Sequence, residues 1–292
     1  MKLFVFGLGY SASHVAKRLA ARGATISGTV RTPDNAAALV AAGYSMHVFA
    51  GARDDVLAAA LSDCDAVLIS VPPGTAQDPV LSVYRDDLLA APNLRWIGYL
   101  STIGVYGDQD GGWVDETTPP DPSSDRSRRR IAAERDWLAL GTTRGVPVQI
   151  FRLAGIYGPG RNQLVQLAQG SARRVIKPGQ VFNRIHVEDI AQTIEASLAR
   201  PCAGAVYNVA DSEPAPPQDV VAFAAALCSV EPPPEIPFAQ AELSDMSRSF
   251  FGDNKRVRNR LLMDELGVTL RYPTYREGLT ALRKAGEGPH AR

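Results

Sequence analysis

The first 155 residues alternate short apolar runs with segments of helical periodicity, and this alternation limits the possible folds more than any other feature. The runs are KLFVFG (2–7), ATISGTVR (24–31), SMHVFA (45–50), DAVLISVPPG (65–74), LRWIGYLST (94–102) and VPVQIFRLAG (146–155). Short strands that are apolar on both faces and separated by helices are typical of a parallel sheet covered on both sides. Because the crossovers are right-handed, the sequence predicts an α/β fold with a doubly wound parallel sheet.

The composition of the chain changes beyond about residue 158, where proline clusters and long loops separate the helical segments. This pattern predicts a second, smaller α+β cap domain built from the C-terminal part of the chain. The expected boundaries are 1–157 for the sheet domain, with 183–212 returning a helix and a strand to it, 158–182 and 213–286 for the cap, and 287–292 for a flexible tail.

The charge balance and the cysteines exclude several classes of protein. Lys plus Arg and Asp plus Glu both number 31, so no net field attracts nucleic acid or an anionic membrane. No apolar run reaches the roughly 20 residues of a membrane helix. Cys64, Cys202 and Cys228 are too few and too widely spaced for a disulfide framework, and no metal-ligand motif is present. We therefore expect a cytoplasmic protein without a metal, whose partner is a small molecule.

The motif GLGYSA follows the first predicted strand and opens the first predicted helix. It fits the pattern G-x-G-x-x-A, in which Gly7 permits a tight turn, Gly9 lets the backbone approach a pyrophosphate, and Ala12 keeps helix and strand close. Alone, the motif could be only a tight turn, but this position in a doubly wound sheet favours a dinucleotide-binding, Rossmann-type site. The candidate cofactor-binding residues are Gly7, Gly9, Tyr10, Ser11, Ala12, Pro72 and Pro73.

Arg31 stands at the end of the second predicted strand, where NAD-selective proteins place an acidic residue for the ribose 2′-hydroxyl. A guanidinium suits a 2′-phosphate instead, because it pairs bidentately with phosphate oxygens. Arg31 could also be an ordinary exposed loop residue. The sequence favours NADP as the cofactor, with NAD as the alternative.

Several further motifs recur in order along nearly the whole chain. They are LSTIGVYG (100–107), FRLAGIYGPGR (151–161), NRIHVEDIA (183–191), AVYNVAD (205–211), NKRVRNRLLMDELG (254–267) and YPTYREGL (272–279). In this combination the chain resembles the extended short-chain dehydrogenase/reductases, the NAD(P)-dependent epimerase/dehydratase family. The segment RRVIKPGQVFNRIHVEDIA (173–191) is similar to an atypical subgroup represented by the bacterial YeeZ proteins.

The resemblance implies an active site with one departure from the family pattern. Thr102 matches the family's Ser/Thr, whose hydroxyl holds the substrate oxygen. Aligning the family's Y-x-x-x-K-x-x-x-E helix on Glu134 puts Arg126 at the tyrosine and Arg130 at the lysine. A guanidinium stays protonated near neutral pH and is a poor proton donor. Arg130 could still bond a cofactor ribose, or both arginines could line a solvated helix face.

Two further departures narrow the substrate. The acidic pair that follows the threonine in nucleotide-sugar 4,6-dehydratases is replaced by Ile103 and Gly104, which argues against that reaction. The asparagine that usually precedes the YGPG motif is replaced by Gly155, which argues against a nucleotide-sugar substrate.

Because no tyrosine stands at the family's catalytic position, other polar residues near the expected cleft become candidates for the site. Tyr106 and Tyr157 are candidates for proton donation or substrate contact, although such tyrosines are more often packing residues. Arg161, Lys177 and His186 could hold an anionic substrate, while His186 could instead cap the helix that starts at VEDIA.

These observations predict an NADP(H)-binding oxidoreductase or epimerase of the atypical extended type. Its candidate catalytic residues are Thr102, Arg130 and Tyr106. The alternative is a catalytically silent dinucleotide-binding protein that senses its cofactor or presents an interaction surface. A Rossmann methyltransferase fits the later motifs poorly. The resemblance also implies a possible homodimer.

Overall fold

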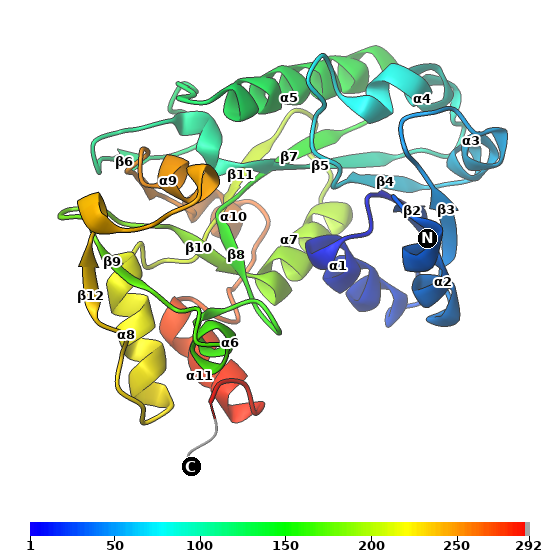
Figure 1. Ribbon diagram of the computed structural model, residues 1–292. Helices are drawn as coiled ribbons and strands as arrows, with labels where there is room; N and C mark the ends of the chain where they lie inside the picture. Colours follow the sequence, from blue (N-terminus) through cyan, green and yellow to red (C-terminus); the bar gives the residue numbers. More distant parts are fainter. Residues whose placement is uncertain (290–292) are drawn as a thin grey trace.

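A seven-stranded sheet forms the larger part of the protein in the computed structural model, which describes residues 1–289 (Figure 1). Its order is β11-β7-β5-β4-β1-β2-β3, and every neighbouring pair is parallel. The strands are β1 (Lys2–Phe6), β2 (Thr25–Val30), β3 (Ser45–Val48), β4 (Ala66–Ile69), β5 (Trp96–Thr102), β7 (Val148–Leu153) and β11 (Val206–Val209). This confirms the predicted doubly wound α/β fold, and the six predicted strands all form.

Helices cover both faces of the sheet. The helices of this layer are α1 (Tyr10–Ala20), α2 (Pro33–Ala41), α3 (Asp55–Ser62), α4 (Pro79–Ala90), α5 (Asp125–Arg144) and α7 (Val187–Ala199). Residues alternate between the faces along each strand. In β1, Leu3 and Val5 pack toward α1 and α7, whereas Phe4 and Phe6 pack toward α3, α4 and α5. The two apolar layers therefore hold the strand ends in fixed positions.

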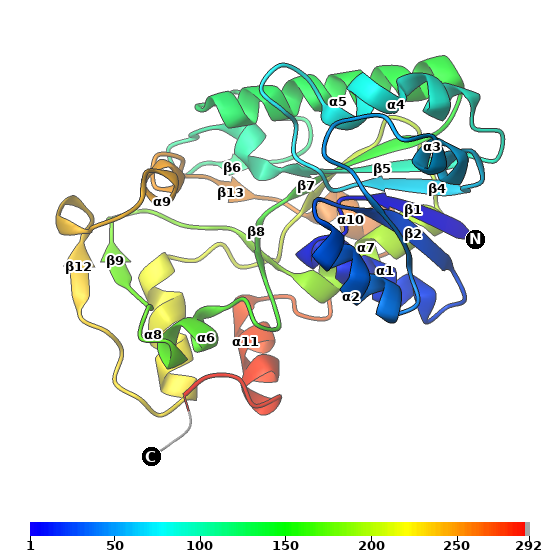
Figure 2. The same ribbon diagram turned by 45° about the vertical axis from the view of Figure 1, so that its right-hand side comes forward.

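A smaller group of elements forms the cap beside this sheet (Figure 2). It contains α6 (Gln163–Ala168), β9 (Arg174–Ile176), α8 (Pro217–Leu227), β12 (Glu235–Pro237), α9 (Asp245–Phe250) and α11 (Tyr275–Lys284). Tyr157, Leu164, Val220, Tyr275 and Leu279 belong to its buried core. Short parallel pairs join β8 (Gly155–Tyr157) to β10 (Arg184–His186) and β9 to β12.

Part of the range expected for the cap packs against the sheet domain instead. β13 (Arg256–Val257) pairs with β6 (Trp113–Val114), and α10 (Arg260–Asp264) contributes Leu262 to the core beside β11. The C-terminal segment that contains β13 and α10 therefore joins the cap to the sheet domain.

The end of the described chain is also held in place. Glu287, the first residue of the predicted tail, accepts a hydrogen bond from the Gly160 amide at 2.9 Å. The last three residues of that predicted tail, 290–292, lie outside the described residues. None of the helices within residues 1–289 combines the length and the apolar character needed to cross a bilayer.

Candidate cofactor and active site

The glycine loop has the backbone geometry that its motif predicts. Gly7 follows β1 with a φ of +81°, and a Cβ at this position would lie 2.8 Å from Val71 Cγ2. Gly9 is the N-cap residue of α1, and no side chain caps this helix. By contrast, Asp54 caps α3 and Asp78 caps α4 with carboxylate oxygens. The first amides of α1 are therefore open to an anion.

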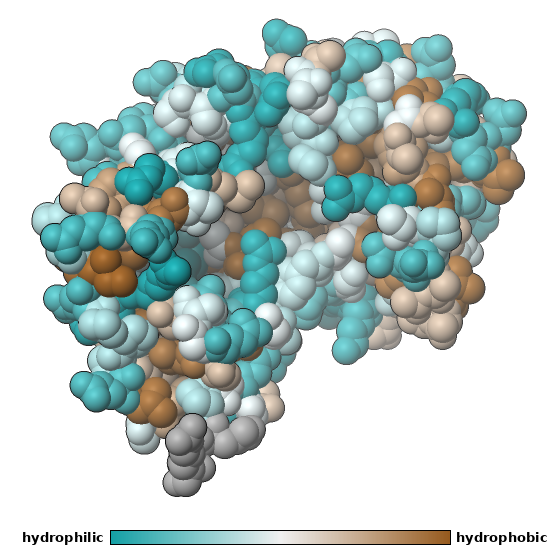
Figure 3. All heavy atoms as spheres, in the orientation of Figure 1, coloured by the Kyte–Doolittle hydropathy of each residue, from teal (hydrophilic) through white to brown (hydrophobic). Residues whose placement is uncertain are grey.

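The strand order reverses next to this loop. β2 lies on one side of β1 and β4 on the other, so the carboxyl ends of the three strands meet there. Arg31 is exposed directly after β2, and Pro72 and Pro73 lie in the loop after β4. Ligands of doubly wound sheets bind at such a point. Figure 3 shows a hollow between the sheet domain and the cap on this side of the molecule.

Tyr10 links the glycine loop to the turn that follows β8. Its hydroxyl donates to the Pro159 carbonyl at 3.1 Å, and burial raises its pKa to about 12. The Arg161 guanidinium lies 5.6 Å from the centre of the Tyr10 ring. Arg161, expected at the substrate, is thus placed beside the cofactor loop.

Thr102 and Arg130 both lie near the end of β5. Thr102 begins the 3₁₀ helix η1 (Ile103–Tyr106), and its Oγ1 accepts from the Gly104 amide at 3.1 Å. Arg130, on α5, donates through Nη1 to the Leu100 carbonyl at 2.9 Å and to the Tyr99 hydroxyl at 3.2 Å. Arg130 therefore packs against β5, which contradicts the alternative of a purely solvated helix face.

Arg126 points toward a different neighbour. Its guanidinium lies 5.1 Å from the centre of the Phe250 ring, on α9 of the cap. Sequence reasoning passed over Ser127, which is buried immediately after Arg126. Nothing in the sequence sets Ser127 apart from the arginines around it. It differs from them in lying on the inward face of α5.

A buried polar network lies beneath Thr102. Arg152 pairs with Glu134 at 2.8 Å, and both side chains are less than a tenth exposed. The Tyr106 hydroxyl accepts from Arg152 Nη1 at 2.9 Å and donates to Asn208 Oδ1 at 2.8 Å. Ser101 donates to Glu134. The expected role of Tyr106 as a proton donor is therefore corrected, because its hydroxyl is fully buried and engaged on both sides.

Two other predicted residues are also buried in structural positions. Tyr157 packs beneath α11, where its hydroxyl donates to the Thr274 carbonyl at 3.3 Å, so it is not open to substrate. His186 is 1% exposed, and its Nδ1 accepts from the Glu188 amide at 3.2 Å as the cap of α7. Burial lowers the pKa of His186 to about 4, which keeps the imidazole neutral. The capping alternative for His186 is the one that the structure supports.

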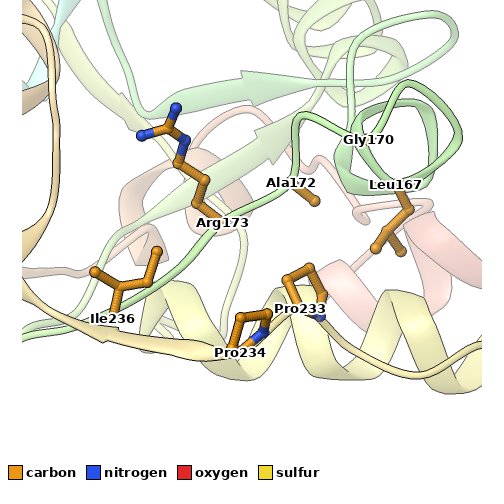
Figure 4. Close-up of a pocket in the computed structure, with 7 residues that line it drawn as sticks. All are labelled: Leu167, Gly170, Ala172, Arg173, Pro233, Pro234 and Ile236. Carbon is orange, nitrogen blue, oxygen red and sulfur yellow. The ribbon is translucent and has the colours of Figure 1, made fainter.

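Lys177 is held by the cap. Its ammonium donates to the Phe251 carbonyl and lies 5.6 Å from the Phe238 ring centre. A separate hollow of about 280 Å³ lies in the cap between α6, β9 and the segment before β12 (Figure 4). Its lining includes Leu167, Pro233 and Ile236, and it is remote in the chain from the glycine loop. Within residues 1–289, no three His, Cys, Asp or Glu side chains gather as metal ligands would.

The order of these features along the chain matches one known family. The sequence model described as the NAD dependent epimerase/dehydratase family matches residues 3–210. The chain belongs to this family. Protein YeeZ of Escherichia coli (strain K12) is 30% identical over 285 residues, which cover 93% of this chain and 96% of YeeZ. The predicted resemblance to the family and to YeeZ is thus confirmed.

Solved structures share the fold over nearly the whole chain. A functionally unknown conserved protein from Silicibacter pomeroyi DSS is 49% identical, with a TM-score of 0.89 and coverage of 98% of this chain and 99% of that chain. A dTDP-glucose 4,6-dehydratase from Bacillus anthracis str. Ames, solved in complex with NAD, is 18% identical, with a TM-score of 0.76 and coverage of 98% and 97%. At this identity, the second likeness shows the shared fold alone.

Proposed function

We propose that the protein binds a nicotinamide dinucleotide and uses it to oxidise, reduce or epimerise a small molecule that carries a hydroxyl or carbonyl group. One observation carries the proposal: the glycine loop opens into the uncapped start of α1 at the point where the strand order reverses. Anionic pyrophosphate is stabilised by amides and by the partial positive charge at such a helix end. Thr102 is the last residue of β5, which lies two strands away from β1.

The cofactor we favour is NADP. Arg31 is exposed after β2, where the ribose of a dinucleotide bound to the glycine loop lies in this fold. An arginine gives a 2′-phosphate a charge-assisted, bidentate partner, whereas it gives a 2′-hydroxyl none of that ionic attraction.

Calorimetric titration of nucleotide-stripped protein with NADPH and NADH tests both points. Replacing Arg31 with alanine is expected to weaken NADPH binding about 10- to 100-fold and to leave NADH binding nearly unchanged. Arg95→Ala is the matched control, because Arg95 is exposed at the opposite end of the strands, where it pairs with Asp65. Equal NADPH affinity in the Arg31 variant and the wild type would refute the NADP preference. Absence of binding of either nucleotide would refute the whole proposal.

In this proposal the chain's own residues bind and orient the substrate, and the cofactor carries the hydride. When bound, the dinucleotide supplies or accepts the hydride. Thr102 holds the substrate oxygen through its hydroxyl, and Arg130 adds positive charge next to the end of β5. With Tyr106 and Tyr157 buried, we infer that water exchanges the proton of the substrate oxygen as hydride moves to or from the adjacent carbon.

The second candidate function is a dinucleotide sensor without turnover. The arginines at the family's tyrosine and lysine positions favour it, because an arginine cannot take over the tyrosine's role as a proton donor. Steady oxidation of NADPH with a panel of aldehydes, ketones and quinones separates the two candidates. A protein that binds NADPH tightly and oxidises it with none of these compounds fits the sensor.

A further inference from the structure

The turn that follows β8 is held against the first turn of α1. Its two ends, Gly158 and Arg161, exchange backbone hydrogen bonds of 3.0 Å in both directions. The Tyr10 hydroxyl donates to the Pro159 carbonyl at 3.1 Å. A Cβ on Gly158 would lie only 2.7 Å from that hydroxyl. Turn and helix are therefore in close contact, and position 158 has no room for a side chain.

Glu287 fixes the same turn from near the end of the chain. One of its carboxylate oxygens accepts from the Gly160 amide at 2.9 Å, and the other accepts from the Asn162 side-chain amide. Both oxygens are thus engaged by groups of the turn. Within residues 1–289, the Arg161 guanidinium takes part in no ion pair, so its charge is not neutralised by a neighbouring carboxylate.

This geometry places the Arg161 charge at the open end of α1. Tyr10 is the first residue of that helix, and the Arg161 guanidinium lies 5.6 Å from the centre of its ring. Gly9, the N-cap residue, is exposed, and so is Arg161. The guanidinium and the unpaired helix amides are therefore both open to a ligand on this side of the cleft.

The glycine loop itself lacks the charge that a pyrophosphate needs. Each phosphate of the group is negative, whereas a helix start supplies only about half a positive charge. Residues 7–12 contain no Lys or Arg, and Lys17 stands roughly two turns further along α1. Burial lowers the pKa of His14 below its ordinary value, so this imidazole is neutral at pH 7. Arg161 brings the missing cation from a distant part of the chain.

We infer that Arg161 binds the pyrophosphate of the dinucleotide together with the amides of the glycine loop. The inference rests on the proposed function, to which it adds a cofactor contact from the cap side of the cleft. A guanidinium presents two parallel N–H groups to phosphate oxygens, which gives both charge and orientation. Arg161 thereby moves from the substrate, where the sequence placed it, to the cofactor.

Calorimetric titration of the nucleotide-stripped protein with NADPH, NADH and ADP tests this role. All three ligands carry a diphosphate, but NADH and ADP lack the 2′-phosphate, and ADP lacks the nicotinamide half. Arg161→Ala is expected to weaken the binding of all three by about the same factor, roughly 10-fold. Arg161→Lys keeps the charge and loses the two-pronged geometry, so a smaller loss of about threefold is expected.

Arg276→Ala is the matched control, because Arg276 is an exposed cap arginine on α11 that pairs with Glu213. Its nucleotide affinities are expected to stay within about twofold of the wild type, since a surface pair contributes little. Thermal unfolding midpoints of every variant verify that each one is folded.

Four results overturn the inference. They are unchanged affinities in Arg161→Ala, a loss confined to NADPH, a loss that spares ADP, and an equal loss in Arg276→Ala. The second would place Arg161 at the 2′-phosphate, the third would place it at the nicotinamide half, and the fourth would reduce its effect to general charge. Failure of the wild type to bind any of the nucleotides is a different result, which refutes the proposed function itself.

Discussion

The ion pair between Glu134 and Arg152 gives the sharpest test of the network beneath Thr102. At 2.8 Å and an effective dielectric constant of about 20, the Coulomb attraction is about 6 kcal/mol. Removing each ion from water costs several kcal/mol, so the intact pair contributes little net stability. Glu134→Gln keeps the side-chain volume but leaves the Arg152 charge buried without a counter-charge. We therefore expect the free energy of unfolding to fall by about 3–5 kcal/mol.

Urea unfolding at constant pH measures this change, and a double-mutant cycle isolates the pair. The double variant Glu134→Gln/Arg152→Met removes both charges and is expected to be more stable than Glu134→Gln alone. Arg135→Met serves as the control, because Arg135 pairs with Asp136 at the surface and its loss should cost less than about 1 kcal/mol. If Glu134→Gln unfolds within about 1 kcal/mol of the wild type, the reasoning about an uncompensated buried charge is wrong.

Two further predictions concern the glycine loop and a buried acid. Gly7→Ala is expected to abolish NADPH binding and to destabilise the fold by more than Gly23→Ala does. Both glycines have φ near +80°, but only at Gly7 would the added methyl group meet Val71. Equal unfolding midpoints for the two variants would contradict this. Burial raises the pKa of Asp211 to about 8. The folded state then holds a proton that the unfolded state loses near pH 4, so Asp211 makes stability fall by up to about 1.4 kcal/mol per pH unit between about pH 4 and 8. Asp211→Asn should flatten this decline in urea midpoints, and a profile parallel to that of the wild type would count against it.

Much of the site could be predicted because its geometry is local. The spacing of Gly7 and Gly9 after an apolar strand requires a tight turn into a helix, and the structure has that turn. The position of Arg31 follows from the same logic, since it comes directly after the next strand. These features depend on residues close together in the chain, so they can be predicted without knowledge of the tertiary contacts.

The functions assigned to single side chains were harder to predict. Tyr106 and His186 carry groups suited to proton transfer, yet burial and hydrogen bonds give both a structural position. Nothing near Tyr106 in the sequence indicates that Asn208 and Arg152 bond its hydroxyl, because these residues lie 102 and 46 positions away.

The sequence by itself determined the parallel sheet, the glycine turn from β1 into α1 and the family, because strand–helix alternation and motif spacing act over short distances along the chain. Only the tertiary structure decided which polar groups remain available for chemistry. Availability depends on burial and on hydrogen-bond partners that come from other strands and helices. The Tyr106 hydroxyl and the Asn208 side chain, 102 residues apart, are hydrogen-bonded because the fold brings them together, and no local pattern encodes that contact.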